Sequence, residues 1–176
     1  LEKEYPITKT KKLKLLLEEG ASFIPYGKEE IQTDEYQNRN NIRIVVFPNT
    51  VKRICDALNS GYVFYFDPDR KGAFYNCTNL ERVILSNKLQ VIGSGAFYDC
   101  SSLTSINIPS SVTQIGNGAF LACNSLTTIN IPNSVTQING SVFRYCSSLT
   151  TINISNSVTQ IGEQAFFHCI SLRSVI

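Results

Sequence analysis

The chain repeats one 23-residue unit three times without interruption between residues 103 and 171. The copies read LTSINIPSSVTQIGNGAFLACNS, LTTINIPNSVTQINGSVFRYCSS and LTTINISNSVTQIGEQAFFHCIS, and the last two agree at 15 of 23 positions. Self-similarity at a fixed period of this length is typical of solenoids, in which each unit contacts only its neighbours. The repeat therefore predicts a stacked array of coils, because no single coil can bury its own apolar side chains.

Two residue types extend the period beyond these three copies. Phenylalanine and cysteine each recur at intervals of 23 residues, and we expect both to turn inward. The phenylalanines are Phe74, Phe97, Phe120, Phe143 and Phe166, and the cysteines are Cys77, Cys100, Cys123, Cys146 and Cys169. Equivalent side chains of stacked coils point in parallel directions, which disfavours disulfides. We expect free, buried thiols in this column, since an unpaired cysteine behaves as a small apolar residue.

Alternation within the unit predicts a half-buried strand followed by turns. Leu103, Ile106 and Ile108 are expected to face inward. Pro109 then ends the strand because it has no N–H to donate. A second short extended piece at residues 112–115 and one tight helical turn at about 119–123 complete the predicted coil.

The outward strand positions supply the candidate ligand-binding residues. They fall one above another in the three copies, and all of them are small or medium polar residues. The set is Ser105, Asn107, Thr128, Asn130, Thr151 and Asn153. Stacked asparagines can stabilise an array through their amides, and the same row can also form an uncharged recognition surface. Both interpretations stay open at this point.

The charge distribution excludes several classes of partner. The net charge is +2, and from Leu89 to Ile176 the only charged residues are Asp99, Arg144, Glu163 and Arg173. Nucleic-acid binding depends on clusters of Lys and Arg, so we expect no nucleic-acid partner. No apolar run approaches the roughly 18 residues of a membrane-spanning helix. The chain also lacks methionine and stops within the strand pattern of residues 172–176, so we expect it to be part of a longer protein.

The first part of the chain departs from the repeat. Residues 1–41 are expected to form a non-repeat cap over the first coil, with a short helix ending at Gly20. Residues 42–54 match the spacing of the strand and the turn that follows it, and an insertion then occupies residues 55–71. The insertion carries a possible aromatic platform for a sugar or peptide, made of Tyr62, Phe64, Tyr65 and Phe66. The alternative is that these rings pack back onto the cap.

No motif predicts catalysis, a metal or a cofactor. The zinc-binding spacings C-x-x-C and C-x-x-H are missing. His168 is the sole histidine, and it is expected to be exposed beside Cys169 without a nucleophile–base arrangement. Cys55 lies off the period and receives no role. We therefore expect a protein that is not an enzyme.

The repeat unit L-T-x-I-x-I-P-x-S-V-T-x-I-G-x-x-A-F-x-x-C-x-S resembles the BspA-like, or Treponema pallidum type, leucine-rich repeats. The resemblance covers residues 42–176, loosely in the first coil and closely from Leu80 onward. It implies a right-handed solenoid with a parallel strand ladder on the concave face and short helical or 3-10 turns on the convex side. Ser86 and Ser155 depart from the pattern at its proline, and Asn139 and Val142 at its glycine and alanine.

The resemblance also implies a class of function. Members of this family are typically surface or secreted proteins, and several are adhesins that bind host matrix proteins or mediate contact between cells. The expected function is thus binding of a host or neighbouring-cell protein, such as a matrix protein, through the polar concave face. The alternatives are a carbohydrate-binding module that uses residues 62–66, and a structural spacer for another domain.

Overall fold

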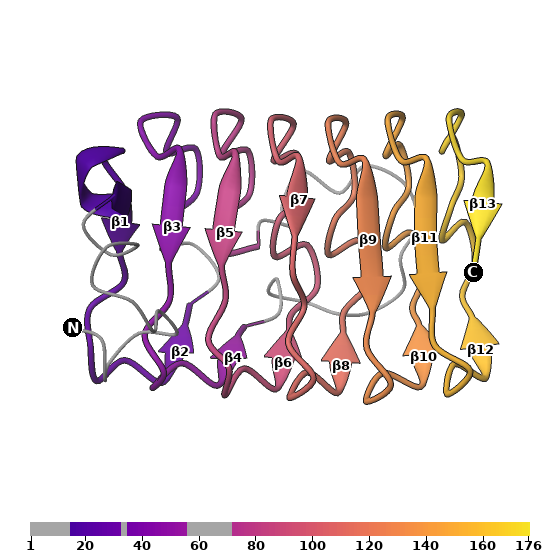
Figure 1. Cartoon of the computed structure of the whole chain (residues 1–176), viewed down its shortest axis with the longest axis horizontal. Helices are drawn as coiled ribbons and strands as arrows, with labels where there is room; N and C mark the ends of the chain where they lie inside the picture. The colour runs from indigo at the N-terminus through magenta and orange to yellow at the C-terminus, as the bar shows by residue number, and fades with distance from the viewer. Residues whose placement is uncertain (1–14, 33–34, 56–71) are drawn as a thin grey trace.

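The computed structural model describes residues 15–32, 35–55 and 72–176. The chain forms a solenoid whose coils stand in a row from the N-terminal to the C-terminal end (Figure 1). Each coil contributes one strand to a seven-stranded parallel sheet with the order β1-β3-β5-β7-β9-β11-β13. These strands are β1 (Ser22–Phe23), β3 (Ile44–Val46), β5 (Arg82–Ile84), β7 (Ser105–Ile106), β9 (Thr128–Ile131), β11 (Thr151–Ile154) and β13 (Ser174–Val175). The predicted solenoid with its parallel ladder is confirmed.

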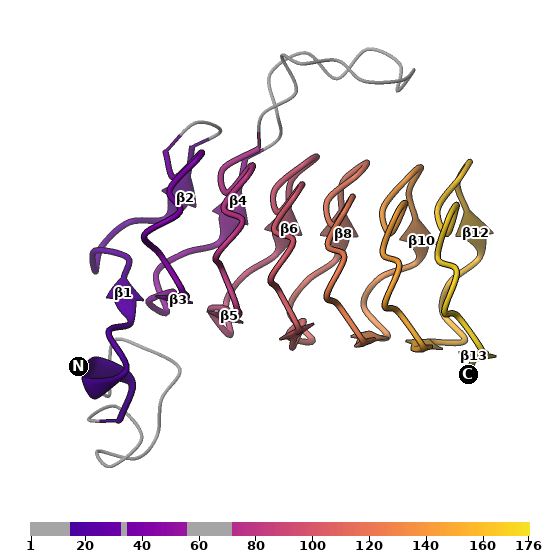
Figure 2. The ribbon, with the colours of Figure 1, turned by 90° about the horizontal axis from the view of Figure 1, so that it is seen from above.

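A second set of shorter parallel strands follows the first around each coil. Figure 2 shows the two ladders separated across the width of the coils. The strands are β2 (Glu30–Ile31), β4 (Arg53–Ile54), β6 (Val91–Ile92), β8 (Gln114–Ile115), β10 (Gln137–Ile138) and β12 (Gln160–Ile161). Pairing runs from β2 to β8 and again between β10 and β12. At the break, Asn139 stands where the repeat has glycine, and its side-chain Nδ2 donates to the Ile115 carbonyl at 2.6 Å.

The third side of each coil consists of tight turns, which differ in detail from the predicted helical or 3-10 turn. Residues 72–176 contain no helical residue. The N–H groups of Phe97 and Asp99 donate to the next coil, at Ala119 and Leu121, over 2.8 and 2.9 Å. The intervening N–H of Tyr98 bonds within its own coil. Because alternate N–H groups donate to the next coil, the consecutive hydrogen bonds that a 3-10 helix needs within one coil cannot form.

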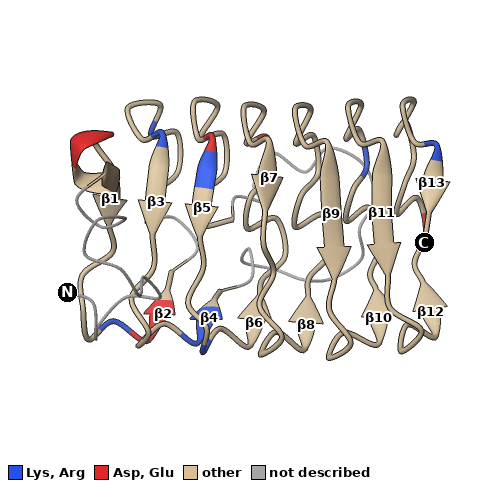
Figure 3. Ribbon diagram, in the orientation of Figure 1, with Lys and Arg blue, Asp and Glu red and all other residues tan. Residues whose placement is uncertain are grey.

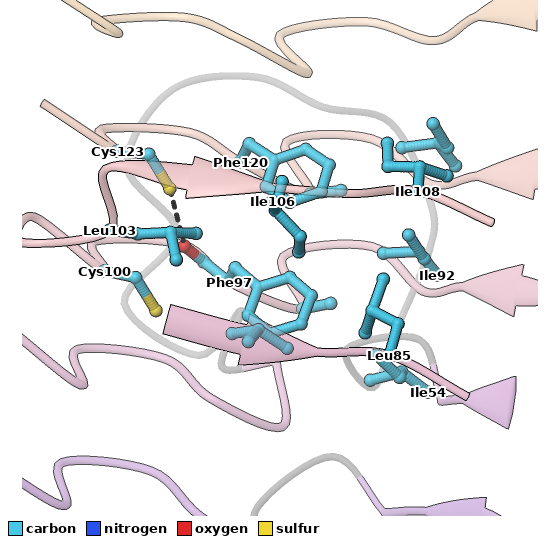
Figure 4. Packing of buried hydrophobic residues seen from close by; sticks show 14 of the residues in the cluster. Ile54, Leu85, Ile92, Phe97, Cys100, Leu103, Ile106, Ile108, Phe120 and Cys123 are labelled. Atoms are coloured by element: carbon cyan, nitrogen blue, oxygen red, sulfur yellow. Dashed lines mark hydrogen bonds between the residues drawn. The ribbon is translucent and has the colours of Figure 1, made fainter. Parts of the chain in front are cut away.

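The core is a set of columns that run the length of the array. Neighbouring phenylalanine rings stack nearly parallel, with Phe97 and Phe120 5.6 Å apart between centroids at an interplanar angle of 6° (Figure 4). The leucine, isoleucine and valine positions predicted to face inward are buried from Val83 to Ile152. The cysteines beside the stack are free thiols, as predicted. Core contacts therefore repeat between successive coils, as expected for a solenoid.

The strand ladders begin inside the segment that the sequence assigned to the cap. Ser22 pairs with Val45 and Glu30 with Arg53, so the spacing of 23 residues already holds there. Tyr36 takes the place of the column phenylalanine and stacks on Phe74, with centroids 5.0 Å apart. Residues 15–18 are helical, and no helix of the described chain is long and apolar enough to cross a membrane.

Candidate functional site

The predicted ligand-binding residues lie together on the outer face of the seven-stranded sheet. Ser105 pairs with Thr128 and Thr128 with Thr151, while Asn130 pairs with Asn153. The side chain of Asn107 is exposed one residue beyond the end of β7. We call the six residues Ser105, Asn107, Thr128, Asn130, Thr151 and Asn153 the polar strand face. Thr151 is partly exposed and the other five are exposed.

The strand register explains why these side chains share one face. Along β9 the burial alternates between exposed Thr128 and Asn130 and buried Ile129 and Ile131. Successive residues of a strand point to opposite sides, so the apolar pair fills the core and the polar pair faces out. Parallel in-register pairing then repeats the arrangement in the next coil.

The fold leaves the hydrogen-bonding groups of the polar strand face unused. Among residues 15–32, 35–55 and 72–176, none forms a hydrogen bond with the side-chain amide of Asn107, Asn130 or Asn153. The structure therefore shows no amide–amide hydrogen bonds between these stacked asparagines. Their side-chain donors and acceptors are exposed and available to a ligand.

Neighbouring threonines have a structural role, because their hydroxyl groups form hydrogen bonds between successive coils. The Thr127 hydroxyl donates to the Thr104 carbonyl at 3.4 Å, and the Thr150 hydroxyl donates to the Thr127 carbonyl at 3.1 Å. These residues precede Thr128 and Thr151 and connect one coil to the next. The side chains of the polar strand face take no part in such connections.

Charge is concentrated at the N-terminal end of the solenoid, and it reaches the edge of the polar strand face at Arg82, which lies beside Ser105 (Figure 3). Arg43 forms a bidentate ion pair with Glu81 at 2.9 and 2.8 Å, and this hydrogen bonding lowers the pKa of Glu81. Arg82 pairs with Glu19 at 2.9 Å. Between β7 and β11 the outer positions carry no charged side chain. The candidate site thus offers hydrogen bonds in a weak electrostatic field.

Residues 15–21 cover the other end of the same sheet face. Leu16 is buried against Ile44 and Val46, with Phe23 and Ile84 packed around them. The helical residues lie outside the ladder beside β1 (Figure 2). The outer face of the sheet is therefore apolar and covered by the chain itself over β3, and polar and open from β7 to β11.

This cover was not predicted, although the sequence holds a signal for it. The run Ile44-Val45-Val46-Phe47 is apolar throughout, and all four residues are buried. A continuous apolar run is typical of a strand that is buried on both faces, whereas β9 alternates. The run therefore indicates that something packs on the outside of β3.

The remaining predicted residues do not assemble into a second chemical site. The aromatic platform of residues 62–66 lies outside the described residues. His168 is exposed and contacts the rings of Tyr145 and Phe167, with centroids 5.2 and 4.5 Å away. The Cys55 thiol lies 3.9 Å from a carboxylate oxygen of Glu30. Within the described ranges, no group of three or more His, Cys, Asp or Glu residues could hold a metal ion.

Three solved structures are similar to this fold over most of the chain. A leucine-rich repeat protein from Bacteroides ovatus matches 89% of the chain with a TM-score of 0.73 and 28% sequence identity. A leucine rich cell surface protein from Faecalibacterium prausnitzii matches 88% with a TM-score of 0.61 and 31% identity. The T. pallidum leucine rich repeat protein matches 87% with a TM-score of 0.59, and its 22% identity supports the fold alone.

The chain spans only part of the first two of these proteins. It covers 37% of the Bacteroides chain, 46% of the Faecalibacterium chain and 78% of the T. pallidum chain. No curated protein matches the sequence. The profile of the BspA type leucine rich repeat region matches residues 70–176 in six copies, which is more than half of the chain. On this match, the chain belongs to the BspA-type leucine-rich repeat family.

Proposed function

We propose that the chain is a binding domain of a cell-surface or secreted protein and that its polar strand face binds a protein ligand. The ligand belongs to a host or to a neighbouring cell, so the domain acts as an adhesin. Binding occurs without catalysis. Leucine-rich repeat proteins are typically protein-interaction modules, and the Faecalibacterium neighbour is a cell surface protein.

One observation carries the proposal: the exposed amides of Asn107, Asn130 and Asn153 have no hydrogen-bond partner among the described residues. Parallel pairing holds the backbone of Asn130 and Asn153 in register, so binding has to order only the side chains. A smaller ordering cost favours specific recognition. The uncharged surface selects a partner by hydrogen bonding and shape more than by long-range attraction.

The test replaces the three asparagines together by tyrosine. Tyrosine is favoured in strands, so the ladder tolerates the change while the rings cover the polar surface. Binding of the wild type and variant to immobilised fibronectin and fibrinogen is measured by biolayer interferometry. We expect saturable binding of the wild type to one of these proteins, and its loss in the variant.

A matched control places the same substitutions on another face. Gln114, Gln137 and Gln160 are exposed strand residues of the same three coils, and Gln137 pairs with Gln160. Their triple tyrosine variant should bind as the wild type does, and circular dichroism checks that both variants fold. Binding that survives the asparagine change, or that is lost only in the glutamine variant, contradicts the proposal. No binding to either matrix protein removes these proteins as ligands and favours a spacer.

A further inference from the structure

The turn side of the solenoid carries aromatic side chains that both strand faces lack between β7 and β12. The residue that follows each column phenylalanine forms a row along this side. The row consists of Tyr75, Tyr98, Leu121, Arg144 and Phe167. All of these side chains except that of Arg144 are at least partly exposed. The first two tyrosines lie in inner coils, where neighbouring coils flank them on both sides.

The rings of Tyr75 and Tyr98 form a pair at the surface. Their centroids lie 5.0 Å apart, and their planes meet at 60°. Burial raises the pKa of Tyr98, which fits a ring that is partly withdrawn from water. The pair thus presents two fixed aromatic surfaces to solvent at neighbouring coils.

Polar side chains accompany both rings. Asn76 and Asp99 follow the tyrosines directly, with φ angles of 56° and 59°. Their N–H groups donate to the carbonyls of Tyr98 and Leu121, both at 2.9 Å. These bonds between coils fix the backbone that carries the polar groups.

The positive φ does not explain why these residues are asparagine and aspartate. Asn and Asp tolerate this backbone conformation well. However, Ala122, Tyr145 and His168 adopt it at the equivalent position of later coils, with φ of 57°, 62° and 58°. At Asn76 the side chain has a structural role, because its Nδ2 donates to Oδ1 of Asn38 in the preceding coil at 2.6 Å. The identity of Asp99 has no such explanation and is free to serve another purpose.

Asp99 holds a carboxylate that the described residues leave without a partner. It is the one acidic residue between Glu81 and Glu163. No hydrogen bond or ion pair joins its side chain to the described part of the chain. Burial raises the pKa of Asp99, as expected where no nearby cation offsets the loss of solvent.

We propose that Tyr75, Tyr98, Asn76 and Asp99 form a binding site for a neutral carbohydrate. The face of an aromatic ring is negative, and the C–H bonds on the face of a sugar ring present positive hydrogens to it. Sugar hydroxyls donate to the Asp99 carboxylate and to Oδ1 of Asn76, whose Nδ2 is held by Asn38. The same carboxylate repels sialylated and sulfated glycans.

The size of the site favours a sugar over a protein. A stable protein interface involves about 20–30 residues on each side. The tyrosine pair and its two polar neighbours provide far less surface, and their nearest apolar neighbour in the row is Leu121. Small-ligand sites instead combine an aromatic contact with a few well-placed polar groups. This site is separate from the polar strand face, so the two proposals can fail independently.

The experiment measures binding of the protein to biotinylated cellohexaose, N-acetylchitohexaose, lacto-N-tetraose and 3′-sialyllactose by biolayer interferometry. We expect saturable binding to at least one of the three neutral glycans and weaker binding to the sialylated one. Tyr98→Ala should weaken that binding by at least about tenfold, because it removes one of the two rings that contact the sugar. Asp99→Asn keeps the shape and should weaken it by about threefold or more, because a charged acceptor is lost.

Two variants provide the matched controls. Tyr26→Ala removes an exposed tyrosine from a loop elsewhere and should leave glycan binding unchanged. The triple asparagine variant of the polar strand face should also bind the glycan normally. If Tyr98→Ala does not fold, Asp99→Asn decides the result. The proposal is overturned by absence of saturable binding to all neutral glycans, by normal affinity in the folded variants, or by preference for the sialylated glycan.

Discussion

The thiol of Cys123 donates a hydrogen bond to the carbonyl oxygen of Phe97, 3.2 Å away in the preceding coil (Figure 4). The same oxygen accepts the N–H of Cys100 within its own coil at 3.2 Å. Equivalent thiol bonds join the other column cysteines to the coil before, at 2.9 to 3.2 Å. Each cysteine therefore fills the core and satisfies a carbonyl that would otherwise have one partner fewer.

We expect the protein to lose stability as the pH rises above about 8.5, the usual pKa of a thiol. Burial raises the pKa of Cys100, Cys123 and Cys146 well above that value. Above it, the unfolded chain releases thiol protons that the folded chain retains. The free energy of unfolding then falls by about 1.4 kcal/mol per thiol for each pH unit.

Urea unfolding under reducing conditions at about pH 7.5 and about pH 10, either side of the thiol pKa, measures this fall. Cys123→Ser provides the control, since a serine hydroxyl does not titrate in this range. In this variant the free energy of unfolding should fall less between the two pH values, by the contribution of one thiol. An unfolding free energy that stays constant over this range would contradict the burial of the thiols.

The phenylalanine column should depend most on its inner rings. Phe120 stacks on Phe97 and Phe143, with centroids 5.6 and 5.7 Å away and interplanar angles of 6° and 3°. Phe120→Ala should cost about 3–5 kcal/mol, the usual loss for a fully buried ring. Phe166→Ala should cost less, because that ring is only partly buried. Urea unfolding of both variants measures the two losses of stability, and equal losses would contradict the expectation that the burial of each ring sets its contribution.

The repeat made most of this fold predictable from the sequence. The spacing of Phe97 and Cys100 to their later copies defined the stacked columns, and the alternation around Ile106 assigned the polar strand face. Both signals were strong because the same side chains must meet in every coil. The turns were harder to predict, since their N–H groups alternate between two coils and the sequence does not encode this directly.

The sequence pattern did not predict the N-terminal coil, because the packing residues of this coil differ from those of the repeat. Tyr36 replaces the column phenylalanine, and the insertion separates it from Phe74 by 38 residues instead of 23. The strand pairing of Ser22 with Val45 keeps the spacing but has no repeated residue type to reveal it. The tyrosine pair on the turn side was missed for a similar reason: Tyr98 and Tyr75 share a position that later coils fill with Leu121, Arg144 and Phe167.

The cover over the outer face of β3 should depend on one of two adjacent leucines. Leu16 is 2% exposed against Ile44 and Val46, whereas Leu17 is 53% exposed. We expect Leu16→Ala to cost about 2 kcal/mol or more and Leu17→Ala to stay within about 0.5 kcal/mol of the wild type. Thermal unfolding compares the two variants, and binding of an apolar dye to Leu16→Ala reports exposure of the sheet face. Equal stability would show that the cover does not contribute.

The close approach of successive coils should make one glycine far more sensitive than another. A Cβ atom on Gly116 would lie 2.3 Å from the Ser94 nitrogen, whereas one on Gly140 would meet nothing closer than the Glu163 oxygen at 3.4 Å. The first clash involves backbone, which cannot move without disturbing the pairing of β6 and β8. We expect Gly116→Ala to cost about 1–3 kcal/mol.

Gly140→Ala is the matched control and should change stability by no more than about 0.5 kcal/mol. The protein carries a side chain at the first position one coil later, because Asn139 occupies it. There the Asn139 amide bonds to the Ile115 carbonyl and the ladder is interrupted between β8 and β10. Gly116→Asn should therefore be better tolerated than Gly116→Ala, since only the amide can replace the lost ladder bond. Urea unfolding of the three variants tests this order of stability. An alanine variant as stable as the asparagine variant would show that the amide does not compensate for the steric clash at residue 116.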